Sequence, residues 1–249
     1  MNNILTLSFI YITSGILLFL FALDQIKINL NNIFISKLHY YIQKTVNTKF
    51  KSFLIGCIAS ALIQSSSGVT AIAITLLSSK FIKQRECLGI IIGANLGTCL
   101  TTFIIAINIS NIFLYILILG IFLYFLFNKY RKYSILIIYI GLMLLGLDIL
   151  NIGFDKIINN SFIYNIINNI QTSNTLSILF GIFSTAIIQS SSGLIGIVEQ
   201  MYFNSLINLN SSILIMLGAN IGTTITGYLA TINTQNNTKT IININLIFL

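Results

Sequence analysis

Charged residues are scarce in this chain, and their scarcity excludes an ordinary soluble domain. Only 7% of the 249 residues are Asp, Glu, Lys or Arg, 56% are hydrophobic, and the mean hydropathy is +0.93. Soluble domains carry about 25% charged residues. The apolar runs are continuous, which is typical of membrane helices. We therefore expect an all-α integral membrane protein that crosses the lipid bilayer several times and has no separate soluble domain.

Proline and tryptophan are absent, and cysteine and histidine are rare. The three cysteines, Cys57, Cys87 and Cys99, form no Cys-x-x-Cys pair and have no histidine cluster beside them, so neither a zinc site nor a disulfide framework is expected. The single histidine, His39, lies in a lysine-rich segment outside the apolar runs. An intramembrane serine hydrolase would therefore lack the base that activates its nucleophile, and no enzyme activity and no bound cofactor is predicted.

Basic residues outnumber acidic ones and give a net charge of +8. A positive charge of this size could indicate binding to nucleic acid. In an apolar chain, however, Lys and Arg mark the loops on the cytoplasmic side of the membrane. No nucleic-acid partner is predicted.

Two polar motifs each occur twice in the apolar background. The Gln-Ser motif is residues 64–67 and again 189–192, each followed by glycine; the Gly-Ala-Asn motif is residues 93–98 and again 218–223. Both pairs are separated by 125 residues, and the alignment extends at an offset of 124 to residues 19–24 and 143–148. Equal separations in both halves indicate an internal duplication, with repeats at 1–133 and 134–249.

The distribution of charge indicates how the chain crosses the membrane. If each segment that carries a Gln-Ser motif is a re-entrant hairpin, 12 of the 13 Lys and Arg residues lie on one face and only Lys156 lies on the other. If every apolar stretch crosses instead, the basic residues divide between both faces. The positive-inside rule favours the hairpins. This topology places the N-terminus outside and makes the two repeats inverted, an architecture typical of secondary transporters.

The two motifs suit a transport site at membrane depth. Irregular backbone survives there only where it is buried in protein or lines a wet cavity. The glycines of both motifs are expected to let the helices break and reverse. Free helix amides attract an anion, whereas free carbonyls and hydroxyls suit a cation such as Na⁺. The predicted binding residues are Gln64, Ser65, Ser66, Ser67, Gln189, Ser190, Ser191 and Ser192.

Other polar residues of the apolar runs have a simpler interpretation. Ser60 is interpreted as a small residue at a helix contact. Asp24 and Asp148 correspond between the repeats, but each ends its apolar run, so an interfacial or capping role is expected. Glu199 has no acidic counterpart in the first repeat, and a lone carboxylate at membrane depth is a candidate for ion binding.

The paired Gln-Ser-Ser-Ser motifs, each followed by Gly-Ala-Asn-x-Gly-Thr, resemble those of the type II sodium/phosphate cotransporters of animals and bacteria. The resemblance covers nearly the whole chain. It implies Na⁺-driven uptake of inorganic phosphate, with Na⁺ as the coupling ion. Whether the chain forms a homodimer is left open. The resemblance also implies that the Gln-Ser residues form the substrate and sodium site, supported by Asn95, Thr98, Asn220 and Thr223.

The chain departs from this family in two respects. No PhoU-like domain follows the membrane part, and the last apolar run, Ile241–Leu249, is too short to span a membrane. The expectation is therefore a chain shortened at its C-terminus. Two alternatives stay open: the same fold with a different anion or with proton coupling, and a truncated remnant that does not transport.

Overall fold

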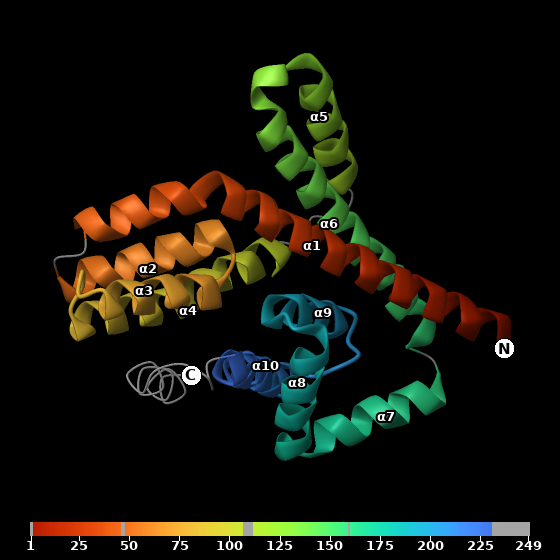
Figure 1. Cartoon of the computed structure of the whole chain (residues 1–249). Helices are drawn as coiled ribbons and strands as arrows, with labels where there is room; N and C mark the ends of the chain where they lie inside the picture. The colour runs from red at the N-terminus through yellow and green to blue at the C-terminus, as the bar shows by residue number, and fades with distance from the viewer. Residues whose placement is uncertain (1, 46–47, 107–111, 159, 231–249) are drawn as a thin grey trace. The chain divides into compact units, whose positions relative to one another are not determined.

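The computed structural model describes residues 2–45, 48–106, 112–158 and 160–230, and within these ranges all regular secondary structure is helical (Figure 1). The predicted all-α class is confirmed. The helices are α1 (Asn2–Thr45), α2 (Lys49–Ile63), α3 (Ser66–Ser78), α4 (Gln84–Ala106), α5 (Ile112–Leu126), a 3₁₀ turn η1 (Asn128–Tyr130), α6 (Arg131–Ile157), α7 (Ser161–Thr172), α8 (Asn174–Ile188), α9 (Ser191–Phe203) and α10 (Leu209–Ala230).

Two of the described helical stretches are long and apolar enough to cross a membrane: Leu5–Phe34 and Asn128–Ile157. Shorter apolar helices are present as well, among them Ile112–Leu126 and Asn174–Ile188. The first apolar run of the sequence, Ile4–Leu23, lies within α1, which continues as a helix to Thr45. The last apolar run, Ile241–Leu249, lies outside the described residues.

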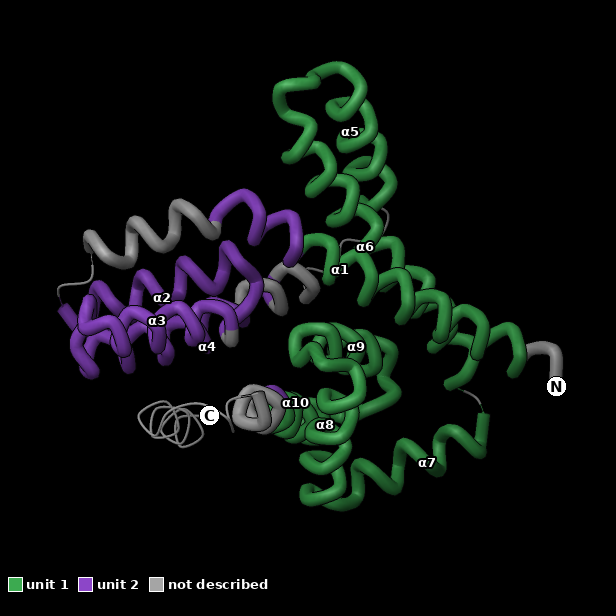
Figure 2. The backbone as a smooth tube through the Cα atoms, in the orientation of Figure 1, with its two compact units in different colours: residues 1–26, 105–222 green, residues 27–104, 223–249 purple. Residues whose placement is uncertain are grey.

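The chain divides into two compact units, residues 1–26 with 105–222 and residues 27–104 with 223–249 (Figure 2). In the first unit, the start of α1 packs against α6. A Cβ added to Gly15 would lie 2.7 Å from the amide nitrogen of Leu150, and one added to Gly146 would lie 2.6 Å from that of Phe19. Such close approach of two backbones is possible only because these positions are glycine.

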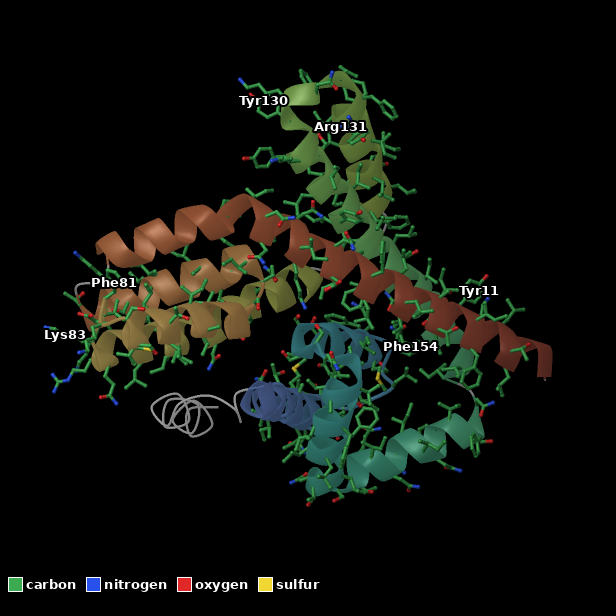
Figure 3. The ribbon with its side chains drawn as sticks, in the orientation of Figure 1. Tyr11, Phe81, Lys83, Tyr130, Arg131 and Phe154 are labelled. Carbon is green, nitrogen blue, oxygen red and sulfur yellow. The ribbon has the colours of Figure 1, made fainter. Side chains whose placement is uncertain are left out.

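The α6 helix carries charge at both of its ends. Arg131 opens the helix and lies over the ring of Tyr124 on α5, with its guanidinium carbon 4.2 Å from the ring centroid. Near the other end, the Lys156 ammonium lies 4.1 Å from the centroid of Tyr11 on α1. Figure 3 shows Arg131 at the turn between α5 and α6, and Tyr11 towards the opposite end of α6. Both cations therefore lie on aromatic faces, a favourable contact near an interface.

The rest of the first unit is a compact set of four helices. α7 packs on α8, and α9 packs on α8 and α6. A small core joins Leu194 and Val198 of α9 to Ile215 and Ala219 of α10. The side chain of Gln171, at the end of α7, accepts from the amide of Asn208 at 2.8 Å, which fixes the connection between α9 and α10.

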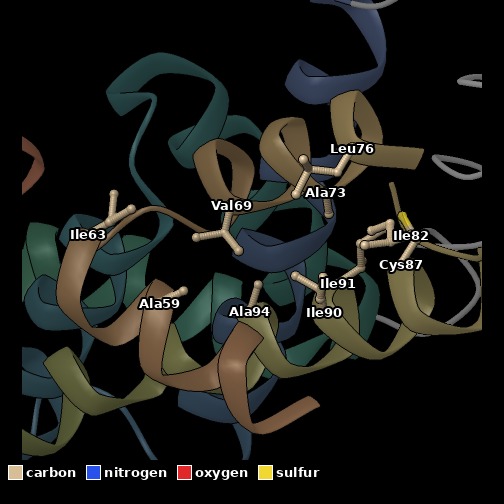
Figure 4. Packing of buried hydrophobic residues seen from close by; sticks show 10 residues of the cluster. All are labelled: Ala59, Ile63, Val69, Ala73, Leu76, Ile82, Cys87, Ile90, Ile91 and Ala94. Atoms are coloured by element: carbon tan, nitrogen blue, oxygen red, sulfur yellow. The ribbon is translucent and has the colours of Figure 1, made fainter. Parts of the chain in front are cut away.

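The second unit holds α2, α3 and α4 around one apolar core (Figure 4). Ala59 and Ile63 near the end of α2 contact a cluster that includes Val69 and Ala73 of α3, so the two helices form a hairpin. Residues from α4, among them Ile90, complete the core. This packing places the Gln-Ser motif at the tip of the hairpin.

The prediction that the Gly-Ala-Asn motifs break their helices is wrong. α4 and α10 run through residues 93–98 and 218–223 without interruption. A Cβ on Gly93 would lie 2.0 Å from the carbonyl oxygen of Phe53, and one on Gly218 would lie 2.1 Å from that of Ile178. These glycines therefore serve close packing of α4 on α2 and of α10 on α8. They do not provide backbone freedom.

Candidate functional site: two helix breaks with the same local geometry

The first Gln-Ser motif is a short break between α2 and α3. Gln64 ends α2 in the left-handed conformation (φ 59°, ψ 32°), and its amide donates to the carbonyl of Ser60 at 2.7 Å. Ser65 is extended, and its hydroxyl accepts from the amide of Gly68 at 3.1 Å. Ser65 is therefore the N-cap of α3.

The second Gln-Ser motif repeats this geometry between α8 and α9. Gln189 is left-handed (φ 57°, ψ 24°), and its amide donates to the carbonyl of Thr185 at 2.7 Å. Ser190 is the N-cap of α9 and accepts from the amide of Gly193 at 3.2 Å. A Cβ on Gly193 would lie 2.6 Å from Cδ2 of Leu20, so this break lies against α1.

The predicted break at each Gln-Ser motif is present, but glycine does not make it. No described glycine has a positive φ, whereas Gln64 and Gln189 both do. Gly68 and Gly193 lie inside the first turns of α3 and α9. A left-handed residue other than glycine is conformationally costly, and such residues concentrate at functional sites.

Each break joins two helix ends of opposite polarity. The last carbonyls of α2 and α8 and the first amides of α3 and α9 lack intrahelical partners. Ser65 and Ser190 each use one of those amides, which leaves the remaining amides of the first turn for a ligand. The amide end favours an anion and the carbonyl end a cation. One break therefore offers both chemistries within a few residues.

The side chains of the motif are accessible to different degrees. Gln189 is exposed, whereas Ser190, Ser191 and Ser192 are partly buried, and the Ser190 and Ser192 hydroxyl oxygens lie 3.4 Å apart. In the first copy, Gln64, Ser65 and Ser66 are partly buried; the Ser67 side chain lies outside the described part of the chain. The Gln64 amide nitrogen donates to the carbonyl of Ala61 at 2.8 Å.

The Gly-Ala-Asn motifs lie against the last turns of the helices that precede each break. A Cβ on Gly97 would lie 2.2 Å from the carbonyl oxygen of Cys57, and one on Gly222 would lie 3.0 Å from Cβ of Thr185. Thr98 donates to the carbonyl of Asn95 at 2.7 Å. Asn220 and Thr223 occupy the matching positions on α10.

Sequence reasoning gave no binding role to two buried hydroxyls beside the breaks. Ser60 and Thr185 lie one turn before Gln64 and Gln189 and are 0% and 1% exposed. Neither hydroxyl has a hydrogen-bond partner. Their equal spacing from the two motifs was readable from the sequence, but their lack of a partner was not.

Glu199 is the one acidic side chain among the buried residues of the described part of the chain. It lies on α9, is 9% exposed, and its Oε2 atom has no hydrogen-bond partner. Asp24 is exposed and Asp148 is partly buried. Among the described residues, no group of three or more His, Cys, Asp and Glu side chains could hold a metal ion.

Helices broken at polar, serine-capped ends within an apolar helical chain are typical of secondary transporters. The comparison with protein families identifies the transporter family. The chain belongs to the Na⁺/Pi-cotransporter family, whose model matches residues 18–152 and again residues 151–249. The resemblance inferred from the two motifs is thus confirmed. The family is one of transporters and has Na⁺ as its coupling ion.

Relatives of the chain carry names that refer to phosphate. The putative inorganic phosphate export protein YjbB of Escherichia coli K12 is 23% identical over 230 residues, which are 91% of this chain and 42% of YjbB. Human sodium-dependent phosphate transport protein 2B is 42% identical over 53 residues, 21% of this chain and 8% of that protein. YqeW of Bacillus subtilis, which is uncharacterized, is 29% identical over 226 residues, 89% of this chain and 72% of YqeW. No solved structure matches the chain.

Proposed function

We propose that the chain is a secondary transporter that imports inorganic phosphate together with Na⁺. The observation that carries the proposal is the pair of serine-capped helix breaks in a chain of the Na⁺/Pi-cotransporter family. In each repeat, amides of the first turn after the break, in α3 or α9, would bind phosphate. The hydroxyls and the glutamine side chain of the same motif, residues 64–67 or 189–192, would complete the site of that repeat. Asn95 and Thr98 of α4 would support the first motif, and Asn220 and Thr223 of α10 would support the second.

No Lys or Arg occurs in either hairpin between residues 53 and 79 or between 174 and 203. The charge of a bound phosphate must then be balanced by helix dipoles, amides, hydroxyls and a cation bound nearby. A co-bound Na⁺ supplies that balance, which is why substrate binding and the Na⁺ gradient would be coupled. The physiological Na⁺ gradient points inward, so coupling would drive import; the name of YjbB, by contrast, refers to export.

The proposal includes two inverted repeats, over residues 1–133 and 134–249. α1 and α6 contain the aligned residues 19–24 and 143–148. Gly15 lies against Leu150, and Gly146 lies against Phe19, so a later residue of α1 meets an earlier residue of α6. The two equivalent helices therefore run antiparallel within the first unit, as inverted repeats require. The two successive matches to the family model also support a duplication.

We further propose that the N-terminus lies outside the cell membrane and that Lys156 is on the same side. The 27 residues of α6 extend about 40 Å, enough to cross a hydrocarbon core of about 30 Å. Cysteine labelling would check this in a background without the native cysteines. A membrane-impermeant maleimide is expected to label Lys156→Cys in intact cells and Lys129→Cys only after permeabilisation. The reverse pattern would refute the proposed orientation.

Uptake of labelled phosphate into proteoliposomes tests the function. With the purified chain, an inward Na⁺ gradient is expected to drive accumulation, whereas an equal gradient of an inert cation such as choline is not. Empty liposomes are the control. Absence of uptake by a well-folded preparation would refute phosphate transport by this chain, and repeating the assay with other anions would then find the solute. Size-exclusion chromatography of the purified chain in detergent would test whether it forms a homodimer.

Proton coupling is the second candidate, because Glu199 is a buried carboxylate with an unpartnered oxygen. Uptake driven by a proton gradient, and lost in Glu199→Gln, would support it over Na⁺ coupling. Among the described helices, five pack against α9: α1, α6, α7, α8 and α10. α8 and residues 209–222 of α10 carry no titratable group. The titratable side chains of the other three are Tyr11 and Asp24 on residues 2–26 of α1, Arg131, Lys132, Tyr133, Tyr139, Asp148, Asp155 and Lys156 on α6, and Tyr164 on α7.

A further inference from the structure

Among the described residues, three hydroxyl groups are buried without a hydrogen-bond partner, those of Ser60, Thr185 and Ser211, and the first two occupy equivalent positions beside the two Gln-Ser motifs. Ser60 is the fourth residue before Gln64, and Thr185 is the fourth residue before Gln189. They are 0% and 1% exposed, and neither Oγ of Ser60 nor Oγ1 of Thr185 has a partner. A buried polar group without a partner is destabilising, so the recurrence of this arrangement in both repeats needs an explanation.

Other buried serines on α2 and α8 do have a hydrogen-bond partner. Ser and Thr side chains within a helix normally donate to a carbonyl one turn earlier. Ser52 of α2 does so, with its hydroxyl 2.8 Å from the carbonyl oxygen of Thr48. Ser177 of α8 donates to the carbonyl of Ile170 at 2.9 Å. Both of these serines are fully buried on the same helices as Ser60 and Thr185. Burial on these helices therefore does not by itself prevent a hydrogen bond.

The surroundings of both hydroxyls favour a cation. The backbone carbonyls of Ser60 and Thr185 accept the amides of the left-handed glutamines, so each residue closes the last complete turn of its helix. The carbonyls that follow, in residues 61–63 and 186–188, lie beyond the last regular intrahelical donor. Of these, the Ala61 carbonyl accepts from the side-chain amide of Gln64. These carbonyls form the negative end of the helix dipole. A hydroxyl oxygen adds a further neutral ligand of the kind that hard cations take.

A neighbouring helix packs beside each of the two hydroxyls. Thr185 lies against α10, since a Cβ on Gly222 would be 3.0 Å from its Cβ. In the other unit, Gly97 of α4 lies against the α2 backbone at Cys57 and Ala61. The same close packing that buries the hydroxyls also excludes bulk water, which strengthens the attraction between a cation and neutral oxygens.

We propose that the hydroxyls of Ser60 and Thr185 are oxygen ligands of a bound monovalent cation at the carbonyl ends of α2 and α8. This inference deepens the proposed function, on which its choice of Na⁺ rests. It replaces the interpretation of Ser60 as a packing residue. Each repeat would hold the anion at the amide end of its break and the cation at the carbonyl end, so that the two charges neutralise each other across a few residues.

Thermal unfolding in detergent without phosphate tests the cation ligands directly. Addition of Na⁺ to the purified full chain is expected to raise its Tm, because a ligand that binds only the folded state stabilises it. Ser60→Ala and Thr185→Val should lose at least half of this shift while their Tm in choline stays equal to or above that of the wild type. Thr185→Ser, which keeps a hydroxyl, should show the full Na⁺-induced shift that Thr185→Val loses. Ser52→Ala and Ser177→Ala are the matched controls and should keep it.

Phosphate uptake on the same proteins separates this inference from the proposed function. If both hold, the Na⁺ concentration for half-maximal uptake should rise about tenfold in Ser60→Ala and Thr185→Val, the effect of losing one ligand to a charged group. Loss of the Na⁺-induced Tm shift in the variants, without any uptake by the wild type, would support the cation site and refute phosphate transport. An unchanged shift in both variants, or no shift in the wild type, would overturn the inference.

Discussion

Replacing Gly93 by alanine is expected to destabilise the fold by about 3 kcal/mol or to prevent folding, although alanine is the better helix former by about 1 kcal/mol. The new Cβ would lie 2.0 Å from the carbonyl oxygen of Phe53, a separation that atoms in proteins do not reach. The obstacle is backbone, so no rotamer change relieves it, and α4 must move away from α2. That movement would open the core around Ile90 and the hairpin that carries the first Gln-Ser motif.

Thermal unfolding in detergent, followed by far-UV circular dichroism, measures this effect. Gly218→Ala should behave in the same way, because its Cβ would lie 2.1 Å from the carbonyl oxygen of Ile178. Gly68→Ala is the control. Its Cβ would meet only the side chain of Ser65, at 3.1 Å, so a change within about 1 kcal/mol is expected. Equal Tm values for Gly93→Ala and Gly68→Ala would contradict the role given to close helix packing.

The different roles of these glycines explain which part of the fold the sequence could predict. The position of each hairpin tip was predictable, because three successive serines interrupt an apolar run. The residue that reverses the backbone was not. Glycine serves both for positive φ and for close approach of two backbones, and the sequence does not distinguish these uses. Gly93 and Gly218 have the second use, and the left-handed residues at the two hairpin tips are glutamines.

A similar limit applies to the candidate site. The duplicated motifs identify Gln64 and Gln189 without any structure, because an equal spacing of 125 residues is visible in the sequence. Ser60 has the same spacing from Thr185, but a serine among apolar residues most often bonds to its own helix. Whether its hydroxyl finds an acceptor depends on the rotamer and on the neighbouring helix. The sequence contains neither, so the unpartnered hydroxyls emerge only from the packed structure.

The second large effect is expected at the two glutamines, where backbone and side chain can be separated. Gln189→Gly keeps the left-handed conformation and removes the amide side chain, whereas Gln189→Ala removes the side chain and leaves a residue with a Cβ at φ 57°. If the side chain binds substrate or cation, both variants should lose at least about tenfold in phosphate uptake, which corresponds to about 1.4 kcal/mol. The glycine variant should also be at least as stable as the wild type, because glycine adopts this conformation without strain.

Gln64→Gly and Gln64→Ala extend the comparison to the first break. The Gln64 side chain donates to the carbonyl of Ala61, so its removal also frees an oxygen at the end of α2. Uptake assays and Tm measurements on the four variants would distinguish two roles. Loss of uptake in all four, with stable glycine variants, assigns the glutamines to binding. Normal uptake in the glycine variants, with loss in the alanine variants, would show that the left-handed break itself is required and that the amide side chains are not ligands.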